Sequence, residues 1–235
     1  MSNYINHLKQ MYTPKTFGRK VDYVKYNFSD VLVNVKSRDF SVLEIGPGMG
    51  ESIWYLNSQG IRNIDIVDND REILAYLSKK FKINKVILNR DLGKLDKVLG
   101  DYDLIIMVQV LEHIPPSNYK NAIPTLYRHL KKGGTIVLVV PNANNPLGIV
   151  ERYADLQHYT SFTEQSLRDV ISGSGIKRFT FKIRGFEIPP YSLLNIIRIC
   201  LQKLLHLILL ATMIVNGGNF FTVMTPNIML VIKKD

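Results

Sequence analysis

Three glycines within five residues, in the stretch Gly46-Pro47-Gly48-Met49-Gly50, are the strongest chemical signal in this sequence. They follow a short apolar run that carries one carboxylate, Glu44, and a helical pattern begins at Glu51. Because glycine has no Cβ, backbone N–H groups in such a turn can approach a ligand that ordinary side chains would keep away. The stretch therefore predicts a binding turn for a nucleotide-like cofactor, between a buried strand and a helix.

Two carboxylates follow later apolar runs and could serve the same ligand. Asp68 lies 20 residues after Gly48, the separation at which a strand, a helix and a second strand bring an acid to a cofactor ribose. Asp68 could instead cap the next helix, although Asp70 is better placed for that role. Asp91 follows the third run and either contacts the cofactor or caps the short helix after it.

These groups require a sheet whose strand ends meet at one edge. Apolar runs at residues 40–45, 63–67, 85–88, 102–108 and 135–140 alternate with helical patterns at 51–58, 71–80 and 118–130. A helix at 163–173 and two further strands, at 178–184 and 227–233, complete the pattern. The alternation predicts an α/β fold with a doubly wound, Rossmann-like sheet of seven strands.

The glycine turn with its preceding acid, E-x-G-x-G-x-G, resembles motif I of the class I S-adenosylmethionine-dependent methyltransferases. The stretch DLIIMVQVLEHIP resembles the segment around strand four of that family, and the turn L-K-x-G-G at 130–134 resembles the one before strand five. A nicotinamide enzyme is disfavoured, because the third glycine is out of register with G-x-G-x-x-G. The resemblance implies a methyltransferase with S-adenosyl-L-methionine as its cofactor, and an antiparallel pair formed by the last two strands.

The resemblance also implies roles for particular residues. The glycine turn would lie against the amino-acid and ribose parts of the cofactor, Asp68 would bind the ribose hydroxyls, and Asp91 would contact the adenine amino group. The segment after strand four would line the cofactor near the methyl donor. The cofactor-binding residues predicted in this way are Glu44, Gly46, Pro47, Gly48, Gly50, Asp68, Asn69, Asp91, Leu92, Gln109 and Val110.

Residues 141–162 form a long stretch with little periodicity, which is typical of a functional loop. Its pattern, P-N-x-x-x-P-x-G followed by R-Y-x-D-x-x-H, resembles a methyltransferase subgroup associated with surface-polysaccharide synthesis. The predicted substrate contacts are Asn142, Arg152, Tyr153 and Tyr159, and Arg152 would either bind a phosphate or remain a solvated charge.

A hydroxyl acceptor needs a base within hydrogen-bond reach, and two histidines are candidates. His113 follows the fourth strand, at the edge where open α/β sheets bind ligands, and His158 lies in the long loop. Asp155 could orient His158. The predicted catalytic residues are Glu112, His113, Asp155 and His158. The histidines lack the sequence spacing of metal ligands, so no metal site is predicted.

Segments outside the sheet predict a lid and an insert. The N-terminus reads as two helices broken at Pro14 and Gly18, and Tyr12, Thr16 and Arg19 could reach the cofactor. The predicted organisation is an N-terminal helical lid at 1–39, a Rossmann-like domain at 40–185 and 223–235, and an apolar helical insert or cap at 186–222.

Within the insert, residues 193–215 are strongly apolar but are interrupted by a polar stripe of Asn195, Arg198, Gln202 and His206. Three interpretations stay open: a buried cap over the substrate pocket or a homodimer seam, a helix lying on anionic lipid, and a membrane span. The longest uninterrupted stretch, 207–215, is short for a span.

Composition restricts the partners. A hydrophobic content of 46% with 21% charged residues describes a folded chain. The formal net charge of +10 favours an anionic acceptor or an acidic lipid surface, while the absence of an arginine-rich run or an aromatic ladder disfavours nucleic acid. One cysteine, Cys200, and an N-terminus without a signal-like apolar core predict a cytoplasmic protein, with membrane association left open.

The function predicted from the sequence is O-methylation of a sugar or phosphorylated intermediate in capsule or surface-glycan synthesis. The alternatives are N-methylation of a small phosphorylated amine, O-methylation of a lipid-like, quinone-type acceptor, and a non-catalytic cofactor-binding subunit.

Overall fold

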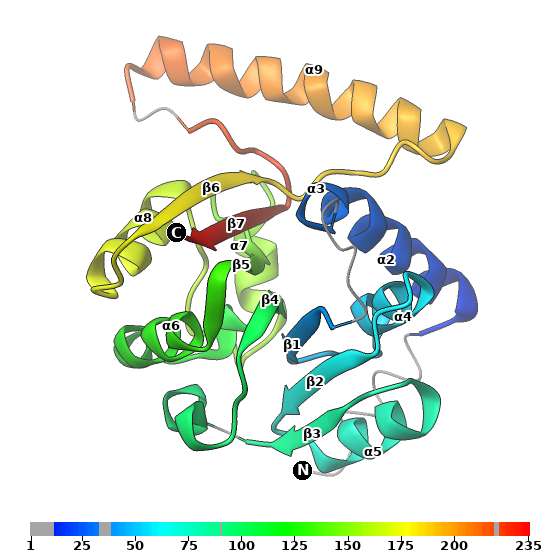
Figure 1. Cartoon of the computed structure of the whole chain (residues 1–235). Helices are drawn as coiled ribbons and strands as arrows, with labels where there is room; N and C mark the ends of the chain where they lie inside the picture. The colour runs from blue at the N-terminus through cyan, green and yellow to red at the C-terminus, as the bar shows by residue number, and fades with distance from the viewer. Residues whose placement is uncertain (1–11, 33–38, 90, 219–220) are drawn as a thin grey trace.

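The structure, a computed structural model, describes residues 12–32, 39–89, 91–218 and 221–235. A seven-stranded sheet of order β3-β2-β1-β4-β5-β7-β6 forms its centre (Figure 1). The strands are β1 (Ser41–Ile45), β2 (Asn63–Asp68), β3 (Lys85–Leu88), β4 (Tyr102–Val108), β5 (Leu130–Pro141), β6 (Phe179–Gly185) and β7 (Asn227–Lys234). Strands β1 to β5 are parallel, and β7 runs antiparallel to both β5 and β6.

Helices cover both faces of the sheet. On one face lie α2 (Pro14–Asn27), α4 (Glu51–Ser58) and α5 (Arg71–Lys80), and on the other lie α6 (Tyr119–Arg128) and α8 (Glu164–Gly173). Successive strand residues point to opposite faces, so Val42 packs with the first set and Leu43 with the second. Burial on both faces explains the continuous apolar runs, and it leaves the carboxyl edge of the parallel strands as the open place for a ligand.

The N-terminal segment differs from its prediction. The break expected at Gly18 is wrong, because α2 runs through that residue and a Cβ there would meet nothing within 4 Å. Pro14 begins the helix and Thr13 caps it by accepting a hydrogen bond from the Thr16 N–H. The helix α3 (Ser29–Leu32) follows. The helix predicted before Pro14 lies outside the described residues.

The stretch at 141–162 contains a short helix, α7 (Gly148–Ala154), where an irregular loop was predicted. Gly148 permits a close approach, since a Cβ there would lie 2.5 Å from the Asn142 carbonyl oxygen. The helix escaped prediction because its apolar residues Ile149 and Val150 face solvent, so no buried stripe marks it. Three short 3₁₀ helices complete the described chain: η1 (Leu92–Lys97), η2 (Leu111–His113) and η3 (Pro116–Asn118).

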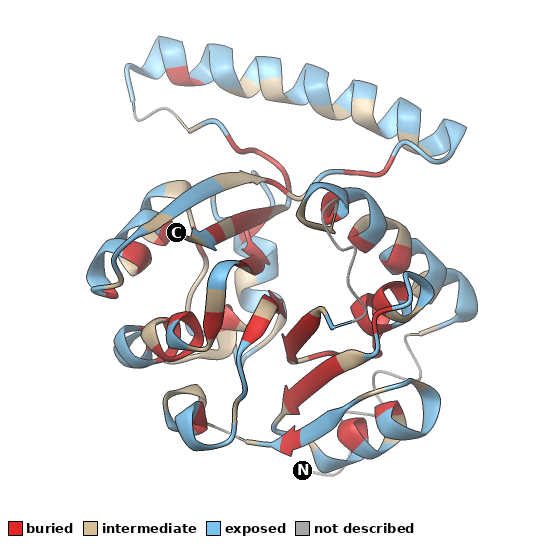
Figure 2. Cartoon of the chain, in the orientation of Figure 1, coloured by how far each residue is buried: buried red, intermediate tan, exposed pale blue. Residues whose placement is uncertain are grey.

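The apolar insert forms one helix, α9 (Leu193–Asn216), that stands apart from the sheet and its covering helices (Figure 1). Of its 24 residues only Met213 is buried, and the helix is exposed along its length (Figure 2). By length and composition, α9 is sufficient to cross a bilayer. The sequence suggested otherwise, because its longest uninterrupted stretch, 207–215, is short for a span. The less exposed positions include the polar Asn195, Gln202 and His206 on one side, and the opposite, apolar side is turned outward.

Candidate active site

The three glycines of the turn after β1 all have positive φ angles, of 63° at Gly46, 52° at Gly48 and 88° at Gly50. Side chains at two of them would collide, because a Cβ at Gly46 would lie 2.4 Å from Val110 Cγ2 and one at Gly50 would lie 2.4 Å from the Phe81 ring. At Gly48 a Cβ would meet only Glu51 Oε2, at 3.8 Å. Gly46 and Gly50 therefore shape the turn, while Gly48 leaves open space beside it.

A cavity of about 700 Å³ opens at the carboxyl ends of β1, β2 and β4. The predicted site residues that line it are Gly46, Gly48, Asp68, Asn69, Leu92, Gln109, Val110, His113 and Asp155. We call the part formed by Gly46, Gly48, Asp68 and Gln109 the glycine end. We call the part formed by Glu112, His113, Asp155 and His158 the histidine end, although Glu112 and His158 lie behind its wall.

Asp68 ends β2 and faces the cavity. One of its carboxylate oxygens accepts a hydrogen bond of 2.8 Å from the Asp70 N–H, and burial raises the pKa of the Asp68 carboxyl above its usual range. Asp70 also accepts from the N–H groups of Glu72 and Ile73, so it is the N-cap of α5, as the sequence indicated. Asp68 therefore does not cap α5, and its carboxylate can bind a ligand in the cavity.

Asp91 takes the capping role that the sequence left open. Its carboxylate accepts from the Gly93 N–H at 3.0 Å and pairs with Lys94 at 3.3 Å, and it does not line the cavity. Its neighbour Leu92 and the nearby Asn89 do line the cavity. At this strand end Asn89 and Leu92 therefore face the cavity, whereas the Asp91 carboxylate does not.

Glu44 lies beneath the turn and outside the cavity. Its side chain is buried, one carboxylate oxygen has no hydrogen-bond partner among the described residues, and Ser52 contributes a hydrogen bond. Burial raises the pKa of Glu44 to about 8. Pro47 and Gly50 are buried too, which makes these three residues supports of the turn rather than its surface.

Gln109 follows β4 with a φ of 56°, a conformation that non-glycine residues seldom adopt. Its side-chain amide donates a hydrogen bond of 2.8 Å to Asn227 Oδ1, at the start of β7. Strained residues of this kind are enriched at functional sites. Sequence reasoning missed Asn227, because nothing local indicates that β7 returns beside β5, the strand next to β4.

The histidine end joins η2 to the loop after α7. The Tyr159 N–H donates to the Glu112 carbonyl at 2.8 Å, which holds the loop against the turn. The rings of His113 and His158 stack edge to face with centroids 4.6 Å apart. Burial and then the neighbouring His158 lower the pKa of His113, so its ring is neutral near pH 7.

The predicted substrate residues all lie outside the cavity wall. Asn142 is buried and its amide donates to the carbonyls of Val223 and Thr225, at 2.9 and 2.8 Å, so it fastens β5 to the segment before β7. Arg152 donates to the Tyr159 carbonyl at 3.1 Å and stacks on the Tyr153 ring. Tyr153 and Tyr159 are exposed.

A polar link ties the N-terminal helix to the glycine turn. Tyr12 donates a hydrogen bond of 2.6 Å to Glu51, the first residue of α4, and Lys20 contacts both residues. Thr16 instead joins the cap of α2, and Arg19 is exposed. Glu51 was not among the predicted site residues, although its position directly after the third glycine was a usable signal.

Comparison with known proteins agrees with this geometry. A protein family described as a methyltransferase domain matches residues 15–179, which is more than half of the chain. The chain belongs to this methyltransferase family. The predictions of an enzyme, of a class I methyltransferase and of S-adenosylmethionine as cofactor are thereby confirmed. The surface-polysaccharide subgroup stays a prediction.

Curated relatives of the methyltransferase match only part of it. The ribosomal RNA small subunit methyltransferase A of Hydrogenobaculum sp. (strain Y04AAS1) is 28% identical over 124 residues, which are 50% of this chain and 46% of that protein. The protein of the same name from Cytophaga hutchinsonii is 26% identical over 137 residues, 52% of each chain. The chain spans about half the length of the curated relatives it matches.

Solved structures share the methyltransferase fold over nearly the whole chain. A SAM-dependent methyltransferase from Archaeoglobus fulgidus superposes with a TM-score of 0.62 at 18% identity, covering 91% of this chain and 94% of that one. The plantazolicin methyltransferase BamL, solved with a triazolic desmethylPZN analog and SAH, gives 0.63 at 17% identity, covering 99% and 90%. At these identities the likeness confirms the predicted fold.

The residues of the methyltransferase fit its cofactor. The open space at Gly48 admits a ligand close to backbone, and Asp68 offers a carboxylate oxygen to ribose hydroxyls in the same cavity. Gln109 and Val110 would lie beyond them, between the cofactor and the histidine end. The individual site assignments remain predictions, to which the structure adds Asn89, Asn227 and Glu51.

Proposed function

We propose that this methyltransferase transfers a methyl group to a hydroxyl oxygen. The observation that carries the proposal is that Asp68 and His113 line one cavity, which places a ribose-binding acid and a neutral imidazole at its two ends. When bound, S-adenosylmethionine supplies an electrophilic methyl group. A hydroxyl acceptor must lose its proton as it takes that methyl group, so a base beside the acceptor accelerates the reaction.

The chain's own residues divide the work. Gly48 and Asp68 bind and orient the cofactor, and Gln109 and Val110 set the distance from it to the acceptor. His113 takes the acceptor proton, and its lowered pKa keeps the ring in the form that can accept one. Asp155 carries a negative charge near His113 and favours the imidazolium that results.

We propose a sugar or phosphorylated intermediate of surface-glycan synthesis as the acceptor. The pattern of the loop at 141–162 supports the choice, as does the net charge of +10, which attracts anionic molecules. Arg152 can pair with a phosphate if its guanidinium releases the hydrogen bond that it donates to the Tyr159 carbonyl.

A lipid-like acceptor is the second candidate, and one observation favours it. Leu156 is 99% exposed and lies between Asp155 and Gln157, which both line the cavity. Further apolar side chains of the same segment are exposed: Leu147, Ile149, Val150 and Tyr153. An apolar rim of this kind suits an acceptor with a hydrocarbon part.

Methyl transfer from labelled S-adenosylmethionine separates the candidates. Sugar phosphates, nucleotide sugars, small phosphorylated amines and a quinol in vesicles would each be offered to untagged protein. We expect product with a sugar hydroxyl, and a rate reduced about a hundredfold or more in His113→Ala. His206→Ala on α9 is the matched control and should retain the rate. Equal rates in both variants would favour an amine acceptor, which needs less help from a base.

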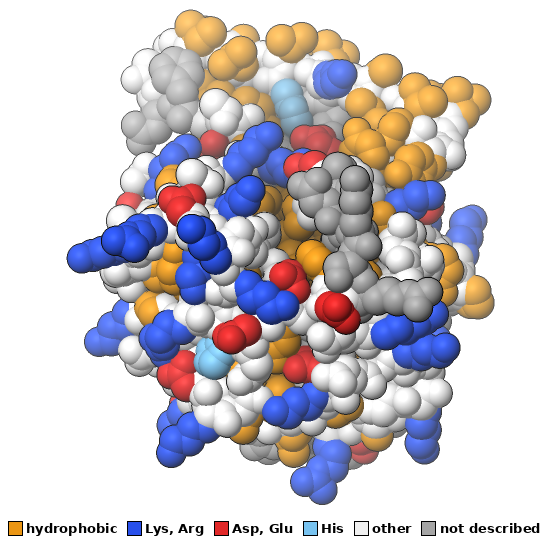
Figure 3. All heavy atoms as spheres, in the orientation of Figure 1, with side chains coloured by type: hydrophobic (Ala, Val, Ile, Leu, Met, Phe, Trp, Pro, Cys, Tyr) orange, Lys and Arg blue, Asp and Glu red, His pale blue; other side chains and the backbone are white. Residues whose placement is uncertain are grey.

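We also propose that α9 rests on an anionic lipid surface. The less exposed positions of the helix recur every three or four residues and include three of its polar side chains, those of Asn195, Gln202 and His206. The other less exposed positions are Ile199, Leu209 and Met213. The outward side is apolar, with Ile197, Leu204 and Ile208 among its exposed residues, and it forms an apolar band along one edge of the molecule (Figure 3).

Charge decides between lying on a membrane and crossing it. Arg198 and Lys203 are exposed in the first half of α9, where a span would place Lys203 in hydrocarbon at a cost of about 2.5–3.5 kcal/mol and Arg198 closer to the interface. Lying flat, the helix keeps both cations at the headgroup level beside acidic lipid. The net charge of +10 adds long-range attraction to the same surface.

The single cysteine gives a direct test, because Cys200 is exposed on α9. A polarity-sensitive fluorophore on Cys200 should report an apolar environment when anionic vesicles are added, and less so at high salt. Leu204→Asn should weaken vesicle binding, whereas Leu88→Asn, at an exposed leucine of β3, should not. A fluorophore shift that needs only higher protein concentration would indicate a homodimer seam instead.

A further inference from the structure

The Glu112 carboxyl group is buried without a hydrogen-bond or ion-pair partner among the described residues. Its residue is 0% exposed, and neither side-chain oxygen has a hydrogen-bond partner within the described ranges. No lysine or arginine among the described residues forms an ion pair with it, and the nearby charged group is another acid, Asp155. A buried, unpaired carboxylate costs several kcal/mol of folding free energy unless it is neutralised by a proton or a cation.

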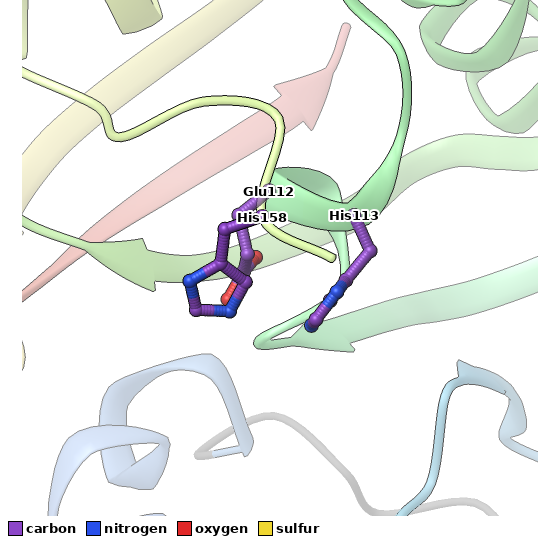
Figure 4. Close-up of side chains that lie close together, drawn as sticks. All are labelled: Glu112, His113 and His158. Carbon is purple, nitrogen blue, oxygen red and sulfur yellow. The ribbon is translucent and has the colours of Figure 1, made fainter. Parts of the chain in front are cut away.

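Two imidazoles face this carboxylate. The ligand-capable atoms of Glu112, His113 and His158 all lie within 4.8 Å of one another (Figure 4). Donors on one divalent ion lie about 3 to 4 Å apart when each bond is about 2.0–2.2 Å long. Small side-chain rotations would therefore bring all three to bonding distance. The sequence hid the cluster, because positions 113 and 158 come from segments far apart in the chain.

Backbone hydrogen bonds orient both rings. His158 Nδ1 lies 3.0 Å from the Glu151 carbonyl oxygen, and the His113 ring is hydrogen-bonded to the Gln157 backbone. A carbonyl oxygen only accepts, so the ring nitrogen facing it must carry the proton and donate. The neutral His158 ring thus keeps Nε2 as a lone pair, and a backbone hydrogen bond of this kind is how metal-binding histidines are commonly held.

We propose that Glu112, His113 and His158 bind one divalent first-row transition-metal ion at the histidine end of the cavity. Two imidazoles and one carboxylate are donors of the type that zinc, iron and manganese accept, and they leave further coordination positions open. His113 lines the cavity, so an open position would face the space for the acceptor.

The ion has a role in methyl transfer that rests on the proposed function. An acceptor hydroxyl bound to the cation would lose its proton more readily, because positive charge stabilises the alkoxide. The oxygen then forms a bond to the methyl carbon while the bond from that carbon to sulfur breaks, and sulfur keeps the electron pair. The released proton passes to Asp155 or to solvent. With the ion bound, His113 acts as its ligand, and the base role proposed above for the free imidazole passes to Asp155 or to solvent.

Metal binding can be measured directly, without an assay of methyl transfer. Untagged protein is stripped with a chelator and titrated with Co²⁺, whose visible absorption reports bound imidazole and carboxylate, and Mn²⁺ is followed by electron paramagnetic resonance. We expect one ion per chain, a rise in Tm on adding it, and an affinity about a hundredfold or more lower in His158→Ala and Glu112→Gln. Glu112→Gln keeps the shape of the side chain and removes the buried charge, so it should fold.

His206→Ala is the matched control and should bind the ion as the wild type does. Absence of binding in the wild type, or equal binding in Glu112→Gln, would overturn the proposal and leave Glu112 as a buried neutral acid. Titration with SAH on the same samples keeps the two proposals distinct. SAH binding without the ion would reject only the metal site, and ion binding without SAH would reject only the proposed function.

Discussion

The glycine end and the histidine end of the cavity each bury one glutamate, and the two are treated differently. Glu44, beneath the glycine turn, receives a hydrogen bond from Ser52, whereas Glu112 has no side-chain partner in the described structure. Burial raises the pKa of both to about 8. One Glu44 oxygen and both Glu112 oxygens therefore lack a hydrogen-bond partner among the described residues, so the uncompensated polar groups are concentrated at the histidine end.

The two ends also differ in how the chain builds them. The core of the glycine end is one continuous stretch of backbone, from β1 through the glycine turn into α4, to which the end of β2 adds Asp68 and the segment after β4 adds Gln109. The histidine end is made by side chains from two distant segments, joined through the Tyr159 to Glu112 backbone hydrogen bond. Substitutions that add bulk should therefore disrupt the glycine turn. Substitutions that remove a ligand-binding side chain should disrupt the histidine end.

The largest effect is expected at Gly50. Gly50→Ala forces a Cβ to within 2.4 Å of the Phe81 ring at a φ of 88°, which should lower the free energy of unfolding by about 3 kcal/mol. Gly60 has a similar φ of 85° but nothing within 4 Å, so Gly60→Ala should cost only about 1–2 kcal/mol. Urea unfolding measures both. Equal losses of unfolding free energy in the two variants would show that the contact with the Phe81 ring does not determine the conformation of the glycine turn.

Glu44→Gln should change how stability depends on pH. The folded pKa of about 8 exceeds the ordinary value near 4.5, so the folded protein holds a proton that the unfolded chain releases. Wild-type stability from this group is therefore full at low pH and falls between those two values, by up to about 1.4 kcal/mol per pH unit. The glutamine variant should lack this fall and be more stable than wild type at about pH 8, by about 2 kcal/mol or more.

Unfolding curves at several pH values check this prediction. If the wild type has a higher free energy of unfolding than Glu44→Gln at high pH, the Glu44 carboxylate must be paired with a partner in the folded protein. Calorimetry of SAH on the same variant shows whether Glu44 also contacts the cofactor, as the family resemblance implies.

Gln109 joins the two ends, and its strain offers a smaller test. Gln109→Gly relieves the positive φ, whereas Gln109→Ala keeps it, and both lose the hydrogen bond to Asn227. The glycine variant should be more stable than the alanine variant by about 1 kcal/mol. The reverse order would mean that the left-handed conformation is not retained when the amide is removed.

Arg152 should matter least to folding. Arg152→Gln removes one partly exposed hydrogen bond, so stability should change by less than about 0.5 kcal/mol. If the acceptor carries a phosphate, kcat/KM should nevertheless fall about tenfold or more. Arg168→Gln, at another surface arginine, is the control. Unchanged kinetics in Arg152→Gln would favour the lipid-like acceptor.

Prediction from the sequence succeeded where local pattern decides. Buried strands read as apolar runs, and the glycine turn and Asp68 follow from spacing along a single strand-helix-strand unit. The same logic separated Asp68 from the helix cap Asp70. At Asp91 the local sequence fitted two roles equally, and the structure places the carboxylate on the Gly93 N–H.

Prediction failed where distance in space is unrelated to distance in sequence. The approach of His158 to Glu112 and of Asn227 to Gln109 depends on the path of the whole sheet. Residues 148–154 gave no helical signal because their apolar side chains are exposed. For α9 the sequence left a cap or dimer seam, a lipid-bound helix and a membrane span open, because an apolar pattern does not show whether its apolar side is buried.

The central claim is that the glycine end binds S-adenosylmethionine through Asp68. Titration calorimetry of SAH with wild type and with Asp68→Asn tests it most directly. The account predicts one SAH per wild-type chain and an affinity about tenfold or more lower in the variant, the value of a hydrogen bond to a charged group. Equal affinity in the two proteins, or binding of NAD in place of SAH, would contradict it.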